Sequence, residues 1–115
     1  FQYKNYSKAC EIFRYALQLC TTPQGAFFAN LGHALLKCRA HDRALEAFQQ
    51  ARKLDPQNAS VLSGVAVSQH LLGNLKDAID NYHRALSLQR DDAFTAEMLN
   101  IAVQECAEQP MNMEI

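Results

Sequence analysis

Histidine and cysteine are the side chains of this sequence whose chemistry is easiest to use at neutral pH. His33 and Cys38 are five residues apart, and His41 follows after a short break. Imidazole and thiolate are ligands that zinc prefers, but a zinc site needs four ligands, and no fourth lies at a suitable spacing. The remaining cysteines are widely separated and form no CxxC pair: Cys10, Cys20 and Cys106. We therefore expect no metal site, and free thiols that pack as small hydrophobic groups.

Catalytic motifs are also missing from the sequence. It contains no glycine-rich phosphate loop, no nucleophile elbow and no HExxH pair. The absence of these motifs predicts no catalytic residue, no cofactor and no small-molecule substrate, so the protein is not expected to be an enzyme. A metal-binding or hydrolytic protein stays as an alternative of another class, and one zinc ion per chain in metal analysis would favour it.

Composition narrows the class further. The chain has 115 residues, 49% hydrophobic and 20% charged, which is typical of a single soluble globular domain. A net charge of -1 gives no electrostatic reason to bind nucleic acid or an anionic membrane. No apolar run approaches the roughly 18 residues that cross a bilayer, and no signal peptide is visible. Because the sequence begins at Phe1, we expect an excised piece of a longer, intracellular protein.

The elements that must position these side chains follow a repeat. The stretch Gly25–Pro56 carries two apolar stripes at helical spacing, separated by a short break and closed by a proline. Its pattern recurs about 34 residues later and about 35 residues earlier. Such a period is typical of a helix-turn-helix array. The residues of the central copy that set the pattern are Phe28, Leu31, Gly32, Leu35, Ala44, Phe48, Ala51 and Leu54.

The period predicts an all-α solenoid of about six helices. Residues 1–107 form the array, followed by a flexible tail over residues 108–115. Asn58 is expected to cap one helix, Gly73-Asn74 to form a turn, and Asp91 and Asp92 to cap the last helix. Within the array, the predicted units are an unpaired second helix at 5–20, repeats at 24–54 and 58–88, and a closing helix at 93–107.

Small residues in the pattern have a packing role. Two helices of a pair approach closely only where side chains are small, so Gly32 is expected beside Ala44, and Ala66 beside Ala78. Phe48 is expected to fill the core between pairs.

This pattern resembles the tetratricopeptide repeat. The central copy matches it almost completely, the next has Ala66 where glycine is typical, and the last helix departs further with Asn100. The resemblance implies a right-handed superhelix that binds proteins or peptides in its concave groove.

A narrower resemblance lies at the C-terminal end. The run Arg90-Asp91-Asp92-Ala93-Phe94-Thr95, with Met98-Leu99, is similar to a tetratricopeptide scaffold subunit of the anaphase-promoting complex. That likeness implies a non-catalytic part of a mitotic ubiquitin ligase, present in nucleus and cytoplasm. It also implies two kinds of partner: a small stabilising subunit, whose N-terminal segment lies in the groove, and neighbouring scaffold subunits.

The side chains expected to line the groove lie on the first helix of each pair, on the face turned away from the partner helix. We expect a neutral groove that takes an extended or helical peptide through its backbone and apolar anchors. The same faces also carry Leu36, Ser60, Leu71 and Phe94. The residues assigned to partner binding are Asn30, His33, Lys37, Ser63, Gly64, Val67, His70, Met98 and Ile101.

Two questions stay open at this point. Glycine inside a helix costs about 1 kcal/mol relative to alanine, so Gly64 either clears room for a peptide backbone or relieves crowding between repeats. The second question is the type of adaptor, because a chaperone-linked or trafficking protein would share this fold. A carboxylate clamp would need several inward cations, whereas Lys37 is the one expected here. Binding of peptides that end in Glu-Val-Asp would favour the chaperone alternative.

Overall fold

The computed structural model describes residues 25–109. Five helices make up this part, and it contains no strand. The predicted helix at 5–20 lies outside the described residues. None of the described helices has the length and apolar character needed to cross a membrane. The helices are α2 (Gly25–Lys37), α3 (His41–Leu54), α4 (Ala59–Leu71), α5 (Leu75–Leu88) and α6 (Ala93–Glu108).

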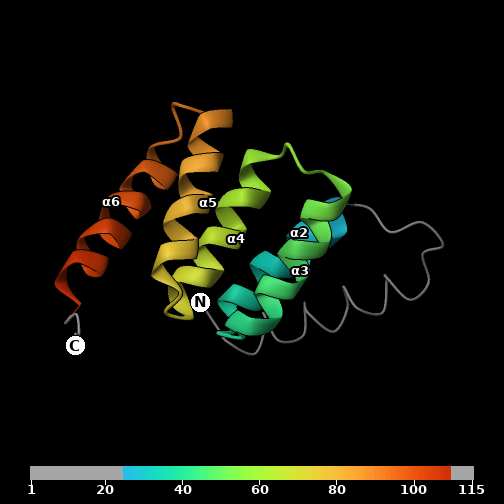
Figure 1. Cartoon of the computed structure of the whole chain (residues 1–115). Helices are drawn as coiled ribbons and strands as arrows, with labels where there is room; N and C mark the ends of the chain where they lie inside the picture. Colours follow the sequence, from blue (N-terminus) through green and yellow to red (C-terminus); the bar gives the residue numbers. More distant parts are fainter. Residues whose placement is uncertain (1–24, 110–115) are drawn as a thin grey trace.

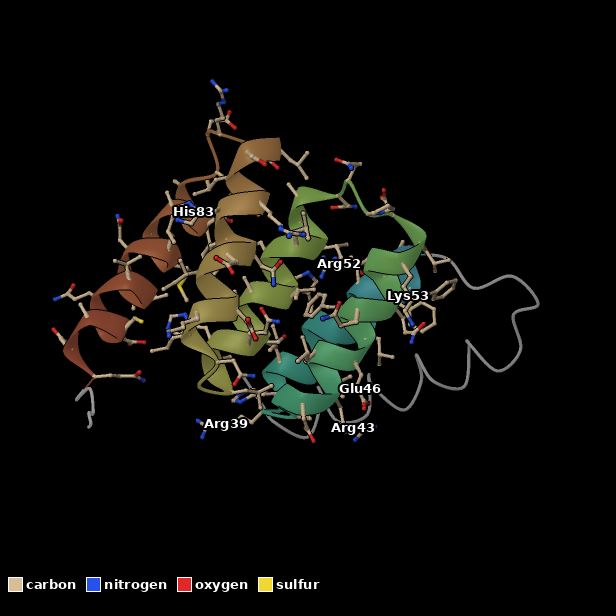
Figure 2. All side chains as sticks on the ribbon, viewed as in Figure 1. Arg39, Arg43, Glu46, Arg52, Lys53 and His83 are labelled. Carbon is tan, nitrogen blue, oxygen red and sulfur yellow. The ribbon has the colours of Figure 1, made fainter. Side chains whose placement is uncertain are left out.

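Consecutive helices pack against one another along the array. α2 pairs with α3 and α4 with α5, while α3 contacts α4 and α5 contacts α6. Figure 1 shows that α2, α4 and α6 run in one direction and that α3 and α5 run in the opposite one. α2 also touches α4, and α4 touches α6, so the first helices line one side of the array. Figure 2 shows charged side chains such as Arg43, Glu46 and Lys53 on α3, and all three are exposed.

The starts of α4 and α6 are fixed by the side chains predicted to cap them. Asn58 Oδ1 accepts a hydrogen bond from the Val61 backbone N–H at 3.2 Å. Asp92 Oδ1 accepts from the Thr95 backbone N–H at 3.2 Å, and Asp92 Oδ2 accepts from the Thr95 hydroxyl at 2.7 Å. These bonds satisfy donors that have no partner inside the helix. Of the two aspartates proposed for α6, Asp92 is the one that caps it.

Both turns within the helix pairs have the same left-handed form. Gly73 has φ +90, as suits a glycine, and Arg39 takes φ +64 at the equivalent position 34 residues earlier. In each turn the next residue's N–H bonds back to the last helical turn, Ala40 to Leu35 O at 2.9 Å and Asn74 to Gln69 O at 2.8 Å. This is the Schellman ending of a helix. Both turns were predicted, but the residue type of Arg39 did not indicate a left-handed backbone.

Phe48 is the centre of the first core cluster and is 0% exposed. A Cβ placed on Gly32 would lie 2.8 Å from the Phe48 ring, and one on Gly64 would lie 2.5 Å from it. Both distances are too short for real contacts, so the ring occupies the space that the glycines leave open. The prediction that Phe48 is core is confirmed. The expected contact between Gly32 and Ala44 stays a prediction, and the nearest atoms to a side chain at position 32 are those of the Phe48 ring.

The C-terminal boundary needs a correction. Helix α6 continues through Glu108, so the predicted tail of 108–115 begins at least one residue too early. No glycine or proline occurs between Ala93 and Pro110, and Pro110 disfavours helical geometry in the residue that precedes it, Gln109. Residues 110–115 lie outside the described part.

Candidate functional site

A hollow of about 410 Å³ opens between α2, α4 and the start of α6. Three first helices therefore contribute to it, as expected for the inner face of the array. Its walls combine apolar side chains, hydroxyl groups and two charges. The lining residues are His33, Leu36, Lys37, Ser60, Ser63, Gly64, Val67, Leu71, Asp92 and Phe94.

The hollow brings together five of the residues assigned to partner binding from sequence. They come from the last two turns of α2 and from the middle of α4, and they lie at the spacings of a single helix face. Ser63 and Gly64 are buried, Val67 is half-buried, and the two α2 residues are exposed. The five are His33, Lys37, Ser63, Gly64 and Val67.

His33 lies with its ring edge-on to the buried Phe48. The ring centroids are 5.0 Å apart and the planes are inclined at 81°. Partial burial, followed by the nearby Lys37 ammonium, lowers the pKa of His33. The imidazole is therefore uncharged at neutral pH, and Lys37 is the cation among the lining residues.

Asp92 forms part of the hollow's wall as well as capping α6. Its oxygens are oriented by Thr95, whose hydroxyl also lies 3.0 Å from Ser63 Oγ. The hydroxyl bond from Thr95, followed by the Thr95 backbone bond, lowers the pKa of Asp92. Sequence reasoning identified Asp92 only as a cap. Its place at the start of a first helix, beside the predicted inner face, is the signal that would have put it in the groove.

Apolar side chains at the edges of the hollow remain open to solvent. Phe94 is 57% exposed and Leu71 is 51% exposed. Exposed aromatic and aliphatic groups around a concave surface favour contact with another molecule.

His70 was assigned to the groove, but it lies in the contact between α4, α5 and α6. Its Nδ1 is 3.1 Å from the Tyr82 hydroxyl, and its Nε2 is 2.7 Å from Glu105 Oε1. The His70 side chain is only 8% exposed. Burial, followed by the Glu105 charge, raises the pKa of Tyr82, so the phenol keeps its proton.

The other three assigned residues also lie away from the hollow. Met98 packs against the second core cluster, which includes Ala66 and Tyr82. Asn30 is exposed on α2, and Ile101 is 39% exposed on α6, but neither lines the cavity.

In residues 25–109, no group of three or more histidine, cysteine or acidic side chains is placed to hold a metal ion. Cys38 is buried in the Phe48 cluster, so packing accounts for it.

Comparison with known proteins supports the same architecture. A family model for the tetratricopeptide repeat matches residues 26–58. A structure titled as the first repeat domain of Spaghetti (RPAP3), bound to an HSP90 peptide, superposes with a TM-score of 0.84 over 90% of this chain and 82% of that one. At 17% identity this likeness shows the fold alone. The chain thus carries a tetratricopeptide repeat at residues 26–58 and has the solenoid fold of tetratricopeptide repeat proteins.

Its sequence is similar to particular members of that class. It is 41% identical over 75 residues to the human "Cell division cycle protein 16 homolog", covering 65% of this chain and 12% of that protein. The "Anaphase-promoting complex subunit 6" of Arabidopsis thaliana is 33% identical over 109 residues, 91% of this chain and 20% of that protein. The chain thus spans a small part of these relatives.

A solved structure agrees with that similarity. The crystal structure of the anaphase-promoting complex hetero-tetramer Cut9–Hcn1 matches with a TM-score of 0.79 and 27% identity, over 85% of this chain and 20% of that chain. The resemblance to a scaffold subunit of this complex is confirmed as a similarity of sequence and of fold.

Proposed function

We propose that this chain is a section of a scaffold subunit of the anaphase-promoting complex and that it holds a segment of a partner protein in the hollow between α2, α4 and α6. At the coarser level, it is a tetratricopeptide scaffold for protein interaction. Two further proposals come from the relatives: one partner is a small subunit whose segment enters the hollow, and the others are neighbouring scaffold subunits. Catalysis is left to other components, and the protein acts in the nucleus and cytoplasm.

The observation that carries this proposal is the composition of the hollow. Val67 and the exposed Phe94 and Leu71 provide apolar contacts, while Ser63 and Ser60 provide hydroxyl groups. A concave, mostly apolar site with a few polar groups suits a protein segment. Similarity to the subunits named above supports the choice of complex.

Proteomics of the full-length protein tests the choice of complex. Affinity purification from dividing cells is expected to recover subunits of the anaphase-promoting complex, as identified by mass spectrometry. Val67→Glu places a charge in the hollow and is expected to reduce recovery of the groove partner at least tenfold, because a buried charge without a partner is costly.

Val103→Glu is the matched control for that experiment. Val103 is 46% exposed on α6 and lies outside the hollow, so this variant is expected to retain the groove partner. Thermal melting of both variants checks that they fold. Recovery of no subunit of the complex would overturn the assignment.

The chaperone-adaptor alternative makes a different prediction. A clamp for a terminal carboxylate needs several converging cations, whereas the hollow contains Lys37, with Asp92 also in its wall. The peptide SRMEEVD, which the RPAP3 structure contains, is therefore expected not to bind this chain in calorimetry. Binding that depends on Lys37 would favour the chaperone alternative.

A further inference from the structure

The two charged residues of the hollow have opposite signs, and neither forms an ion pair with another residue in the described part of the chain. Lys37 and Asp92 are the charged lining residues at neutral pH, because partial burial and Lys37 hold the pKa of His33 low. The one ion pair within residues 25–109 joins His70 and Glu105, outside the hollow. Asp92 accepts hydrogen bonds from Thr95, and no cation of the described residues forms an ion pair with it. Each charge is therefore available to a ligand.

These charges lie at opposite ends of the hollow. Lys37 is the last residue of α2, and Asp92 precedes the first residue of α6. Because α2, α4 and α6 run in the same direction (Figure 1), the end of α2 and the start of α6 are at opposite ends of this layer. The bond between Ser63 and Thr95 places Asp92 beside the first half of α4.

The wall between the two ends carries no charge. Ser63, Gly64 and Val67 follow one another along α4, with Leu36 contributed by α2. This stretch can contact a peptide backbone or an apolar side chain, whereas a charged side chain would lose its hydration there without a partner.

We infer that the hollow accepts a peptide segment of one polarity, with an acidic side chain at Lys37, an apolar side chain over Val67 and a cationic group at Asp92. This inference rests on the proposed binding of a protein segment in the same hollow. A segment with the charges reversed meets a like charge at both ends, so the arrangement selects orientation as well as sequence.

Selection from a random seven-residue peptide display library tests this polarity on the whole 115-residue chain. Enriched peptides are expected to carry an acidic and a basic residue on opposite sides of an apolar residue. A synthetic copy of one such peptide is expected to bind about tenfold more tightly than its twin with the two charges exchanged, since an exposed ion pair contributes up to about fivefold at each end.

Variants that remove one charge at a time assign each charge preference of the peptides to one residue of the hollow. Lys37→Gln is expected to remove the preference for the acidic residue. Asp92→Asn is expected to remove the preference for the basic one while keeping the cap, since asparagine caps helices as well as aspartate does. Lys53→Gln and Asp91→Asn change exposed charges outside the hollow and serve as controls.

The outcomes separate the polarity from the proposed function. In one outcome, the enriched peptides bind the original chain and lose binding in Val67→Glu without any preference in the order of their charges. That result overturns the polarity and leaves the groove proposal in place. If the selection enriches no peptide whose binding depends on Val67, both the polarity and the groove proposal are overturned. Charge preferences that persist in Lys37→Gln and Asp92→Asn also overturn the polarity.

Discussion

Phe48 and Tyr82 occupy equivalent positions in successive repeats, and each lies edge-on to a histidine. Both are 0% exposed. The Phe48 ring is 5.0 Å from His33 at 81°, and the Tyr82 ring is 6.0 Å from His70 at 83°. Yet the histidine beside Phe48 lines the hollow, while the histidine beside Tyr82 lies in a helix contact.

The difference lies in how each aromatic ring is held. Phe48 fits by shape against Gly32 and Gly64 and makes no demand on the polar groups of His33. Tyr82 carries a hydroxyl that must be hydrogen-bonded when buried, and His70 provides the partner. The Tyr82 hydroxyl thus gives His70 a polar partner that the Phe48 ring cannot give His33.

Of the changes that test the difference between the two repeats, removal of the Phe48 ring is expected to lower stability the most. Phe48→Ala leaves a cavity that neither glycine can fill, so the free energy of unfolding should fall by about 3 to 5 kcal/mol. Thermal or urea denaturation measures the change. An unchanged melting temperature would mean that Phe48 does not occupy the core position described above.

A substitution that crowds the same ring is expected to cause the next largest loss of stability. Gly64→Ala would normally gain helix stability, but its Cβ would lie 2.5 Å from the Phe48 ring. We expect a net loss of about 1 to 3 kcal/mol, as for other overpacked cores. Gly25→Ala is the control, because its Cβ makes only ordinary contacts at 3.8 Å.

A double-mutant cycle distinguishes crowding from other costs of that substitution. Phe48→Leu makes room beside residue 64, so Gly64→Ala should cost less in the Phe48→Leu background than in the original chain. Equal costs in both backgrounds would rule out a clash with the ring.

Loss of the Tyr82 hydroxyl has a smaller expected effect. Tyr82→Phe makes the second repeat resemble the first and leaves His70 Nδ1 without its 3.1 Å partner. The expected loss is about 1 to 2 kcal/mol of unfolding free energy. Nuclear magnetic resonance of the His70 ring should also report release from the contact with α5. A spectrum identical to that of the original chain would show that the hydroxyl does not hold His70.

Acid pH should reveal the smallest difference. Because the pKa of His33 is lowered in the folded chain, the unfolded chain takes up the proton first as the pH falls below about 6.5. Stability should therefore decrease on acidification through this range, and His33→Gln should reduce the slope. Urea denaturation between pH 7.5 and 5 measures it. If His33→Gln leaves the pH dependence of stability unchanged, protonation of His33 is not its cause.

The helices were predictable because their signals are local. The spacing of Phe48 and its neighbours, the cap at Asn58 and the turn at Gly73 all act within a few residues of one another. Those signals place the helix bounds within one or two residues of the observed ones. The short break at Arg39 was also predicted, but its left-handed backbone was not, since arginine gives no residue-type signal for that conformation.

The site was only partly predictable, because helix faces depend on how neighbours pack. His33 and Val67 reach the hollow as their positions on α2 and α4 indicate. His70 and Met98 have equally suitable positions, but their side chains meet α5 and α6 partners that the periodicity of a single helix does not describe. Asp92 was overlooked as a wall residue because its capping role already accounted for it.

The position of the Phe48 ring also has a consequence for motion. The ring belongs to α3 but is enclosed by glycines of α2 and α4, so separating the two repeats would expose it. In an array whose stability depends on contacts between neighbours, such a junction should open only with the unfolding of both units. The aromatic side chain of α6, Phe94, is exposed, and this helix is held by Ala102 in the second core cluster and by the Ser63–Thr95 and His70–Glu105 contacts. Amide hydrogens of α6 should therefore exchange with solvent earlier than those of α3.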